Sequence, residues 1–199
     1  MSLLRTGARG AELFRMSADQ ATVTVHALDP DADADLIHGW VTQPRAAFWG
    51  MGGLTRDEVR DAYAFVETLP THHAYLVRWD GTPVVLLQAY DAQDDPVAVA
   101  YDARPGDVGF HFFLSARIEG VSDVWELLGP ALVSFLLSEP GAQRLIAEPD
   151  ARNRAAVARV LAIGFQRGER VRFDSAYGPK DAQLVFLTRE RAAALLAVA

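Results

Sequence analysis

A single histidine in a hydrophobic strand is the first residue of this sequence that could do acid–base chemistry. The stretch Val108–Ser115 is almost wholly apolar and is typical of a buried β-strand. Because side chains alternate along a strand, Gly109, His111 and Phe113 share one face. Burial among aromatic side chains favours the neutral imidazole, which can accept a proton. A core histidine with satisfied hydrogen bonds is the alternative interpretation.

The second candidate follows this strand directly, where Arg117 precedes Gly120 and Ser122. A glycine lets the backbone approach a ligand, and successive N–H groups at the start of a helix can bind phosphate. The same string also fits an ordinary turn. It therefore indicates a phosphate site only in combination with other motifs.

The third candidate is the segment Glu148–Asn153. Pro149 ends a predicted strand, and Asp150 can cap the helix that follows, which would be a purely structural role. Asn153 would present its amide from the first helical turn. Gly164 is suited to end that helix as its C-cap.

A sheet and its helices must position these residues. Residues 1–20 show no clear periodicity, so we expect an N-terminal arm there and a single domain over 21–199. The order of elements indicates one α/β domain of the α+β type, with a mixed sheet flanked by helices. Hydrophobic patterning and turn signals predict strands at 22–28, 74–79, 83–90, 108–115, 144–148, 166–173 and 183–188, and helices at 29–40, 55–69, 124–137, 151–163 and 189–198.

Composition narrows the class of protein. The chain has 199 residues, half of them hydrophobic, and a net charge of −7 from 19 basic and 26 acidic residues. An acidic surface argues against nucleic-acid binding, which needs clustered cations. Without cysteine there is no disulfide, zinc–thiolate site or thiol nucleophile. No apolar run is long enough to span a membrane, so we expect a cytoplasmic protein. We also expect no metal cofactor.

Taken together, the three candidates resemble the GCN5-related N-acetyltransferase (GNAT) superfamily. Its pyrophosphate loop reads Arg/Gln-x-x-Gly-x-Gly/Ala, and here Ser122 is the departure from that pattern. Its next motif carries a tyrosine that often protonates the leaving thiolate, and Val160 stands in its place. The resemblance implies a mostly antiparallel, twisted sheet and an acyl-CoA co-substrate. The matching residues are Arg117, Gly120 and Ser122 in the first motif and Asn153, Ala156, Val160, Gly164 and Phe165 in the second.

A narrower resemblance is to the siderophore-biosynthesis branch of the superfamily, which acylates hydroxylysine in aerobactin synthesis and lysine in mycobactin synthesis, and also serves desferrioxamine synthesis. It extends over about residues 22–190. The stretches that carry it are Gly39–Met51, Gly109–His111, Glu148–Asn153 and Lys180–Gln183.

The resemblance implies roles for individual residues. His111 and Asp150 would be the acid/base pair, and a backbone N–H near Phe113 or Leu114 would stabilise the tetrahedral oxyanion. Because the protein is acidic, coenzyme phosphates would be held locally by backbone N–H groups and Arg117. The expected coenzyme contacts are Phe113, Leu114, Arg117, Gly120, Val121, Ser122, Asn153 and Val160.

The acceptor would be held by the first half of the chain. Trp40, Phe48 and Trp49 could line a slot for an alkyl chain, and Arg45 could bind a carboxylate. Core aromatics beside a surface arginine remain the alternative.

The resulting hypothesis is an acyl-CoA-dependent N-acyltransferase that forms a hydroxamate on an N-hydroxylated amine, such as a hydroxylysine, hydroxycadaverine or hydroxyornithine. Two alternatives stay open: an acyltransferase for another amine, and a non-catalytic acyl-CoA-binding module. The expected partner is a small amine or hydroxyamine, with no nucleic acid and no membrane. Whether the chain forms a homodimer is left open.

Overall fold

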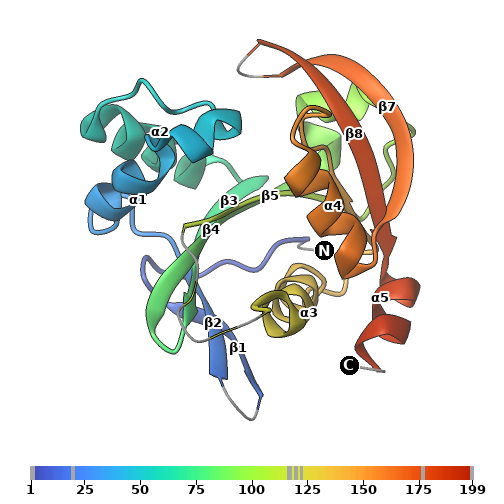
Figure 1. Ribbon diagram of the computed structural model, residues 1–199, viewed down its shortest axis with the longest axis horizontal. Coiled ribbons are helices and arrows are strands. Elements are labelled where there is room, and N and C mark those ends of the chain that lie inside the picture. Colours follow the sequence, from blue (N-terminus) through green and yellow to red (C-terminus); the bar gives the residue numbers. More distant parts are fainter. Residues whose placement is uncertain are drawn as a thin grey trace. The chain divides into compact units, whose positions relative to one another are not determined.

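The computed structural model describes residues 3–18, 21–115, 118, 121, 123–175 and 178–197. Its strands form an eight-stranded sheet in the order β1-β2-β3-β4-β5-β6-β8-β7 (Figure 1). This mixed sheet with its helices confirms the predicted fold class. The elements are β1 (Glu12–Ala18), β2 (Ala21–Ala27), α1 (Ala34–Val41), the 3₁₀ helix η1 (Pro44–Trp49), α2 (Arg56–Thr68), β3 (His72–Trp79), β4 (Thr82–Asp91), the 3₁₀ helices η2 (Ala92–Asp94) and η3 (Pro96–Ala100), β5 (Asp107–Leu114), α3 (Trp125–Leu136), β6 (Arg144–Ala147), α4 (Arg154–Ile163), β7 (Gln166–Ser175), β8 (Gly178–Thr188) and α5 (Arg189–Leu196).

The chain forms two compact units, which we describe separately. The first unit comprises Met1–Arg5, Ala89–His111 and Asp123–Ala199, and the second comprises Thr6–Gln88 and Phe112–Ser122. Strands β4 and β5 each contribute residues to both units.

In the second unit, β1 pairs antiparallel with β2, and β2 pairs antiparallel with β3. The prediction of an arm without regular structure over residues 1–20 is therefore wrong for Glu12–Ala18. This strand lies at the sheet edge with a mostly exposed or half-buried surface, so it lacks the hydrophobic alternation that would have revealed it.

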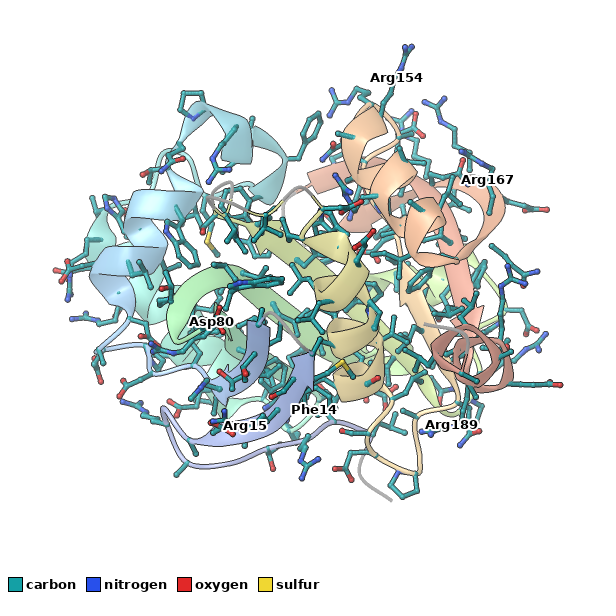
Figure 2. All side chains as sticks on the ribbon, turned by 60° about the horizontal axis from the view of Figure 1, so that its bottom comes forward. Phe14, Arg15, Asp80, Arg154, Arg167 and Arg189 are labelled. Carbon is teal, nitrogen blue, oxygen red and sulfur yellow. The ribbon has the colours of Figure 1, made fainter. Side chains whose placement is uncertain are left out.

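Local signals set other elements of this unit. Thr55 and Glu58 form the predicted capping box at the start of α2. The β3–β4 turn has positive φ at Asp80 (46°) and Gly81 (79°), as a tight hairpin turn requires. The Asp80 carboxylate, labelled in Figure 2, also accepts the backbone N–H of Thr22 at 2.8 Å. The α-helices α1 and α2 of this unit pack against each other.

In the first unit, β5 and β6 form a parallel pair, with Asp107 opposite Arg144 and Gly109 opposite Ile146. Strands β7 and β8 form a long, curved antiparallel ribbon beside α4 (Figure 1). β8 begins at Gly178, five residues before the predicted strand, because the hairpin with β7 extends the ladder. Residues 96–100 form the 3₁₀ helix η3, although their valines at alternate positions are also typical of a strand.

Two polar side chains of this unit bind backbone groups where the regular hydrogen bonding of a strand or helix is interrupted. Gln183 is buried and donates to the carbonyl oxygen of Gly168 at 2.8 Å, where the β7–β8 register shifts. Arg189, at the start of α5, donates to carbonyl oxygens of Leu137, Glu139 and Ala142, so it caps the end of α3 (Figure 2). None of the helices in the described residues is long and apolar enough to cross a membrane.

Candidate functional site

His111 lies on β5 in the first unit, and its ring contacts a carboxylate. Its Nε2 is within hydrogen-bonding distance of Glu148 Oε1. Because an ionised carboxylate can only accept, Nε2 carries the proton in this contact and Nδ1 is the basic nitrogen. The imidazole is 38% exposed, whereas the Glu148 side chain is 2% exposed. The histidine is therefore accessible on one side and held by a buried anion on the other.

Glu148 follows β6 and has three partners among the described residues. Tyr90 donates its hydroxyl to Oε2 at 2.8 Å, and Lys180 Nζ lies 3.2 Å from Oε1, the oxygen that His111 also contacts. Burial raises the pKa of Glu148, but the charge of His111 in its protonated form, the charge of Lys180 and the hydrogen bonds of His111 and Tyr90 outweigh burial. The pKa of Glu148 is therefore lowered to about 2. Glu148 is therefore ionised at neutral pH.

The parallel register of β5 and β6 explains why His111 and Glu148 meet. Each pair in this ladder joins residues 37 positions apart, from Asp107 with Arg144 to Gly109 with Ile146. The same offset, continued two residues further, brings His111 level with Glu148. Neighbouring residues on adjacent strands point to the same face, so the two side chains come together.

Gly109 makes room for the third member of the cluster. A Cβ atom at Gly109 would lie 2.0 Å from the ring of Tyr90, which is far inside van der Waals contact. The tyrosine ring therefore passes over this glycine to reach Glu148. Tyr90 is buried, and burial together with the Glu148 charge raises its pKa well above the usual value, so it remains a protonated donor. Its hydroxyl lies 3.5 Å from His111 Nε2.

Asp150 does not contact His111 in this structure, and its catalytic role stays a prediction. Among the described residues, its carboxylate accepts hydrogen bonds only from Arg152: from the backbone N–H at 2.9 Å, and from the guanidinium of the same residue at 2.7 and 2.9 Å. These bonds, led by the Arg152 side chain, hold the pKa of Asp150 below its usual value. Asp150 lies two residues beyond Glu148, in an isolated bridge to Ala182. The helix cap is Asn153, whose Oδ1 accepts the N–H of Ala156, and not Asp150.

The residues expected to bind coenzyme are placed only in part. Arg117, Gly120 and Ser122 lie outside the described residues. Val121 is described, and its N–H lies 3.4 Å from the carbonyl oxygen of Ile118. Asn153 uses its side-chain oxygen as the cap, which leaves its amide N–H group for another acceptor. Val160 is buried in the packing of α4, so it offers a ligand little surface.

In the second unit, two of the residues expected to hold the acceptor, Arg45 and Trp49, pack against Phe113. The Arg45 guanidinium lies 5.1 Å over the Phe113 ring and donates to the carbonyl oxygen of Leu114 at 3.1 Å. Trp49 packs at 6.0 Å from the same ring and donates to the Tyr63 hydroxyl at 3.1 Å.

The remaining two residues of that expected acceptor site differ in exposure. Trp40 belongs to the hydrophobic core of the second unit, with Ile37, Val59 and Leu76, so the alternative of a core aromatic holds for it. Phe48 is 52% exposed and could contact a ligand.

Sequence reasoning assigned no role to Tyr90, Glu148 or Lys180. Glu148 and Lys180 do stand in the stretches that carried the family resemblance, and a glycine opposite an aromatic residue would have been the signal for Tyr90. Among the described residues, no group of three or more histidine, aspartate and glutamate side chains could hold a metal ion. The cluster is suited to proton transfer, because a carboxylate fixes one imidazole nitrogen and leaves the other basic.

The comparison with protein families decides the family. A family model described as "Acetyltransferase (GNAT) domain" matches residues 29–173. The chain belongs to the GNAT acetyltransferase family. The match covers Tyr90, His111 and Glu148, and ends before Lys180.

Curated relatives carry names from the siderophore-related branch. The chain is 29% identical over 140 residues to the N-hydroxyputrescine acetyltransferase of Acinetobacter baumannii, covering 69% of this chain and 65% of the relative. It is 31% identical over 130 residues to the N(6)-hydroxylysine O-acetyltransferase of Escherichia coli, covering 63% and 40%. It is 30% identical over 132 residues to the lysine N-acyltransferase MbtK of Mycobacterium tuberculosis, covering 62% and 59%. The matches thus span less than two thirds of each relative's length.

Solved structures share the fold of the chain. An uncharacterized protein from Bacillus halodurans superposes with a TM-score of 0.82 at 18% identity, over 95% of this chain and 96% of that protein. AAC(6′)-Ib, solved in complex with paromomycin and acetyl-CoA, gives a TM-score of 0.70 at 21% identity, over 85% of this chain and 94% of that one. These similarities agree with the GNAT fold.

Proposed function

We propose that the protein transfers an acyl group from acyl-CoA to the nitrogen of an N-hydroxylated amine, and so forms a hydroxamate for a siderophore. The observation that carries this proposal is the contact between His111 and the buried Glu148 in a chain of the GNAT family. The names of the relatives support the acceptor class, because two of them are called acetyltransferases of N-hydroxyputrescine and N(6)-hydroxylysine. We place the reaction in the cytoplasm.

His111 would act as the general base. The acceptor nitrogen attacks the thioester carbonyl carbon, and His111 Nδ1 takes the proton that this nitrogen loses. The C–S bond then breaks, and the imidazolium returns the proton to the departing thiolate, so the histidine ends as it began. This route needs no tyrosine at position 160. A lysine-type amine has a pKa near 10.4 and is mostly protonated, whereas a hydroxyamine is far less basic and arrives as a nucleophile.

Other residues would bind the substrates. Backbone N–H groups near Phe113 or Leu114 would stabilise the oxyanion, and the 117–122 segment would hold the coenzyme pyrophosphate. The Asn153 amide would donate to the pantetheine arm. The Asp150 carboxylate would attract the cationic end of a diamine or amino acid, in exchange for its contact with Arg152. Phe48 and Trp49 would contact the alkyl chain, and Arg45 would bind an acceptor carboxylate.

The test combines binding with turnover. Calorimetry with acetyl-CoA should show binding, and thiol release should be fast with hydroxycadaverine, hydroxylysine or hydroxyornithine and slow with the parent amines. Binding with turnover only on non-hydroxylated amines would favour the alternative of another acceptor. Binding with no turnover on any amine would favour a non-catalytic acyl-CoA-binding module.

The His111→Ala variant tests the assignment of the base. Removing a general base should lower kcat by about 10²–10⁴-fold and leave acetyl-CoA affinity unchanged. His26→Ala is the matched control, because His26 lies on β2 in the second unit and its ring bonds to Gly10 and Thr24. Equal turnover in His111→Ala and wild type would overturn the catalytic role of this histidine.

A further inference from the structure

Lys180 is the only lysine in the sequence. The other 18 of its 19 basic residues are arginine. All the remaining basic positions carry arginine, and position 180 alone carries the smaller, more compact ammonium group of lysine. This ammonium group contacts Glu148. An ammonium is a point charge, whereas a guanidinium is a wide planar fork.

The ammonium group of Lys180 is partly buried and contacts a carboxylate. Lys180 lies on β8 and its side chain is 23% exposed, with Nζ 3.2 Å from Glu148 Oε1 and 5.9 Å from the centroid of the Phe173 ring. Phe173 is the cross-strand partner of Lys180 in the β7–β8 ladder. The ammonium group thus lies near a buried ring as well as in contact with the buried carboxylate.

An ammonium group and an imidazole share one carboxylate in this cluster. Lys180 and His111 both contact Oε1 of Glu148, and Tyr90 occupies Oε2 as a neutral donor. If Lys180 were absent, Glu148 would be compensated only by a protonated His111. With Lys180 present, the carboxylate already has a counter-charge, and a second positive charge on the imidazole is repelled by the first.

We propose that Lys180 is a positioning residue that acts through Glu148 to keep His111 neutral, with its proton on Nε2 and Nδ1 free to accept one. The role as base rests on the proposed function, but the effect on the imidazole charge does not. Lys180 does not touch the reacting atoms in this proposal. It supplies the positive charge that would otherwise be supplied by protonating the base.

The other charged and titratable groups around the cluster come from several elements. Tyr90 on β4 interacts electrostatically with Asp95, which lies in the loop after η2. Tyr101 interacts electrostatically with Glu148. Asp150, after β6, interacts with Lys180. All of them remain in a Lys180 variant, so a change in the charge of His111 can be assigned to the loss of the lysine.

The test is the pH dependence of kcat/KM in a Lys180→Met variant. Methionine keeps a long unbranched side chain and removes the charge. The acidic limb of the profile should move to higher pH by about one unit, and rates below the limb should fall about tenfold, because removing a like charge at this range shifts a titration by that much. Lys180→Arg should move the limb less, since it keeps the charge. A Lys180→Met profile that superposes on the wild type would overturn the proposal.

A second measurement is independent of turnover. NMR titration of the imidazole signals, with His111 identified from His111→Ala, should show its midpoint at higher pH in Lys180→Met. An unchanged midpoint overturns the role of Lys180 even if the protein is an active acyltransferase. A shifted midpoint in a protein without turnover supports Lys180 and contradicts only the proposed function.

The control is Arg172→Met. Arg172 neighbours Phe173 on β7 and pairs with Asp181, so it lies on the opposite face of the same hairpin. Its removal takes away one positive charge and should leave the imidazole midpoint in place. Circular dichroism confirms folding of each variant. If Lys180→Met is unfolded, Lys180→Gln replaces it with a polar side chain of similar length.

Discussion

The register of strands β5 and β6 brings together two pairs of ionisable side chains, and the two pairs differ in what they can do. At the start of the strands Arg144 donates to both carboxylate oxygens of Asp107, at 2.6 and 2.7 Å. Four residues further on, His111 meets Glu148. Both pairs join residues 37 positions apart, so one register builds both.

We call the pair of Arg144 and Asp107 the closed pair, because it is largely shielded from solvent and Asp107 has further hydrogen-bond donors. Asp107 also accepts the Tyr101 hydroxyl at 3.1 Å and the N–H of Arg104 at 2.8 Å, and both members of the pair are largely buried. Arginine keeps its charge at all physiological pH values. The pair therefore has a fixed protonation state and a structural role.

We call the pair of His111 and Glu148 the open pair, because the imidazole is partly exposed to solvent. A histidine can gain or lose its proton near neutral pH, and His111 is the most exposed member of its cluster. The anion is the buried partner here, and its charge is balanced by a lysine from another strand. The comparison teaches that strand register brings charged groups together, while the residue type and its exposure decide whether the contact is structural or reactive.

The largest expected effect on stability comes from breaking the closed pair. Arg144→Met leaves Asp107 buried without its counter-charge, which should lower the free energy of unfolding by about 3–5 kcal/mol in urea titration. Turnover per folded molecule should be retained, because this end of the strands holds none of the candidate catalytic groups. The control Arg170→Met removes an exposed partner of Asp181 and should leave the midpoint unchanged. A large loss of kcat in folded Arg144→Met would contradict the distinction between the two pairs.

The second-largest expected effect is a pH dependence of the free energy of unfolding, which comes from Glu148 in the open pair. The pKa of Glu148 is lowered to about 2 from an ordinary value of 4.5. A depressed folded-state value stabilises the protein above the unfolded pKa, and this stabilisation is lost as pH falls from about 4.5 to about 2. It amounts to ~3 kcal/mol at about 1.4 kcal/mol per unit.

The Glu148→Gln variant removes that titration. Its unfolding free energy should be lower near neutral pH and should fall less steeply in acid than that of the wild type. Asp150→Asn is the matched control, because Asp150 lies outside the cluster and is held by Arg152. If both variants lose the acid dependence equally, Glu148 is not the dominant buried anion.

A smaller effect is expected from filling the space over Gly109. Gly109→Ala places a methyl group against the Tyr90 ring, and the displaced ring should cost about 1–3 kcal/mol of stability and lower kcat. Gly39→Ala is the control, since Gly39 lies in α1 with nothing within 4 Å of its Cβ position, and there alanine should be neutral or slightly stabilising. Unchanged turnover in Gly109→Ala would show that the Tyr90–Glu148 contact is not needed.

Much of the fold follows from local sequence. The capping box at Thr55, the Asp80-Gly81 turn and the apolar run of β5 each produced the predicted element. The edge strand β1 and the extended start of β8 did not show in the sequence. Their residues are mostly polar or exposed, and their strands exist because a partner strand offers its backbone.

The site was predicted unevenly for a similar reason. His111 was found because an ionisable group in an apolar strand is conspicuous in a single sequence. Asp150 was chosen as its partner from the family resemblance, and the structure pairs His111 with Glu148 instead. Two acidic residues separated by one proline look alike in a sequence, and only the position of each relative to the end of β6 separates them.

The sequence by itself determined the class of the domain, its acidic charge, the absence of thiol chemistry, the family resemblance and the base candidate. These properties depend on residue type and on spacing along the chain. The tertiary structure decided which carboxylate the histidine meets, that Tyr90 reaches it over a glycine, and that the single lysine balances its charge. Those contacts join residues 37, 58 and 32 positions apart, and strand pairing, which is a long-range interaction, fixes their distances.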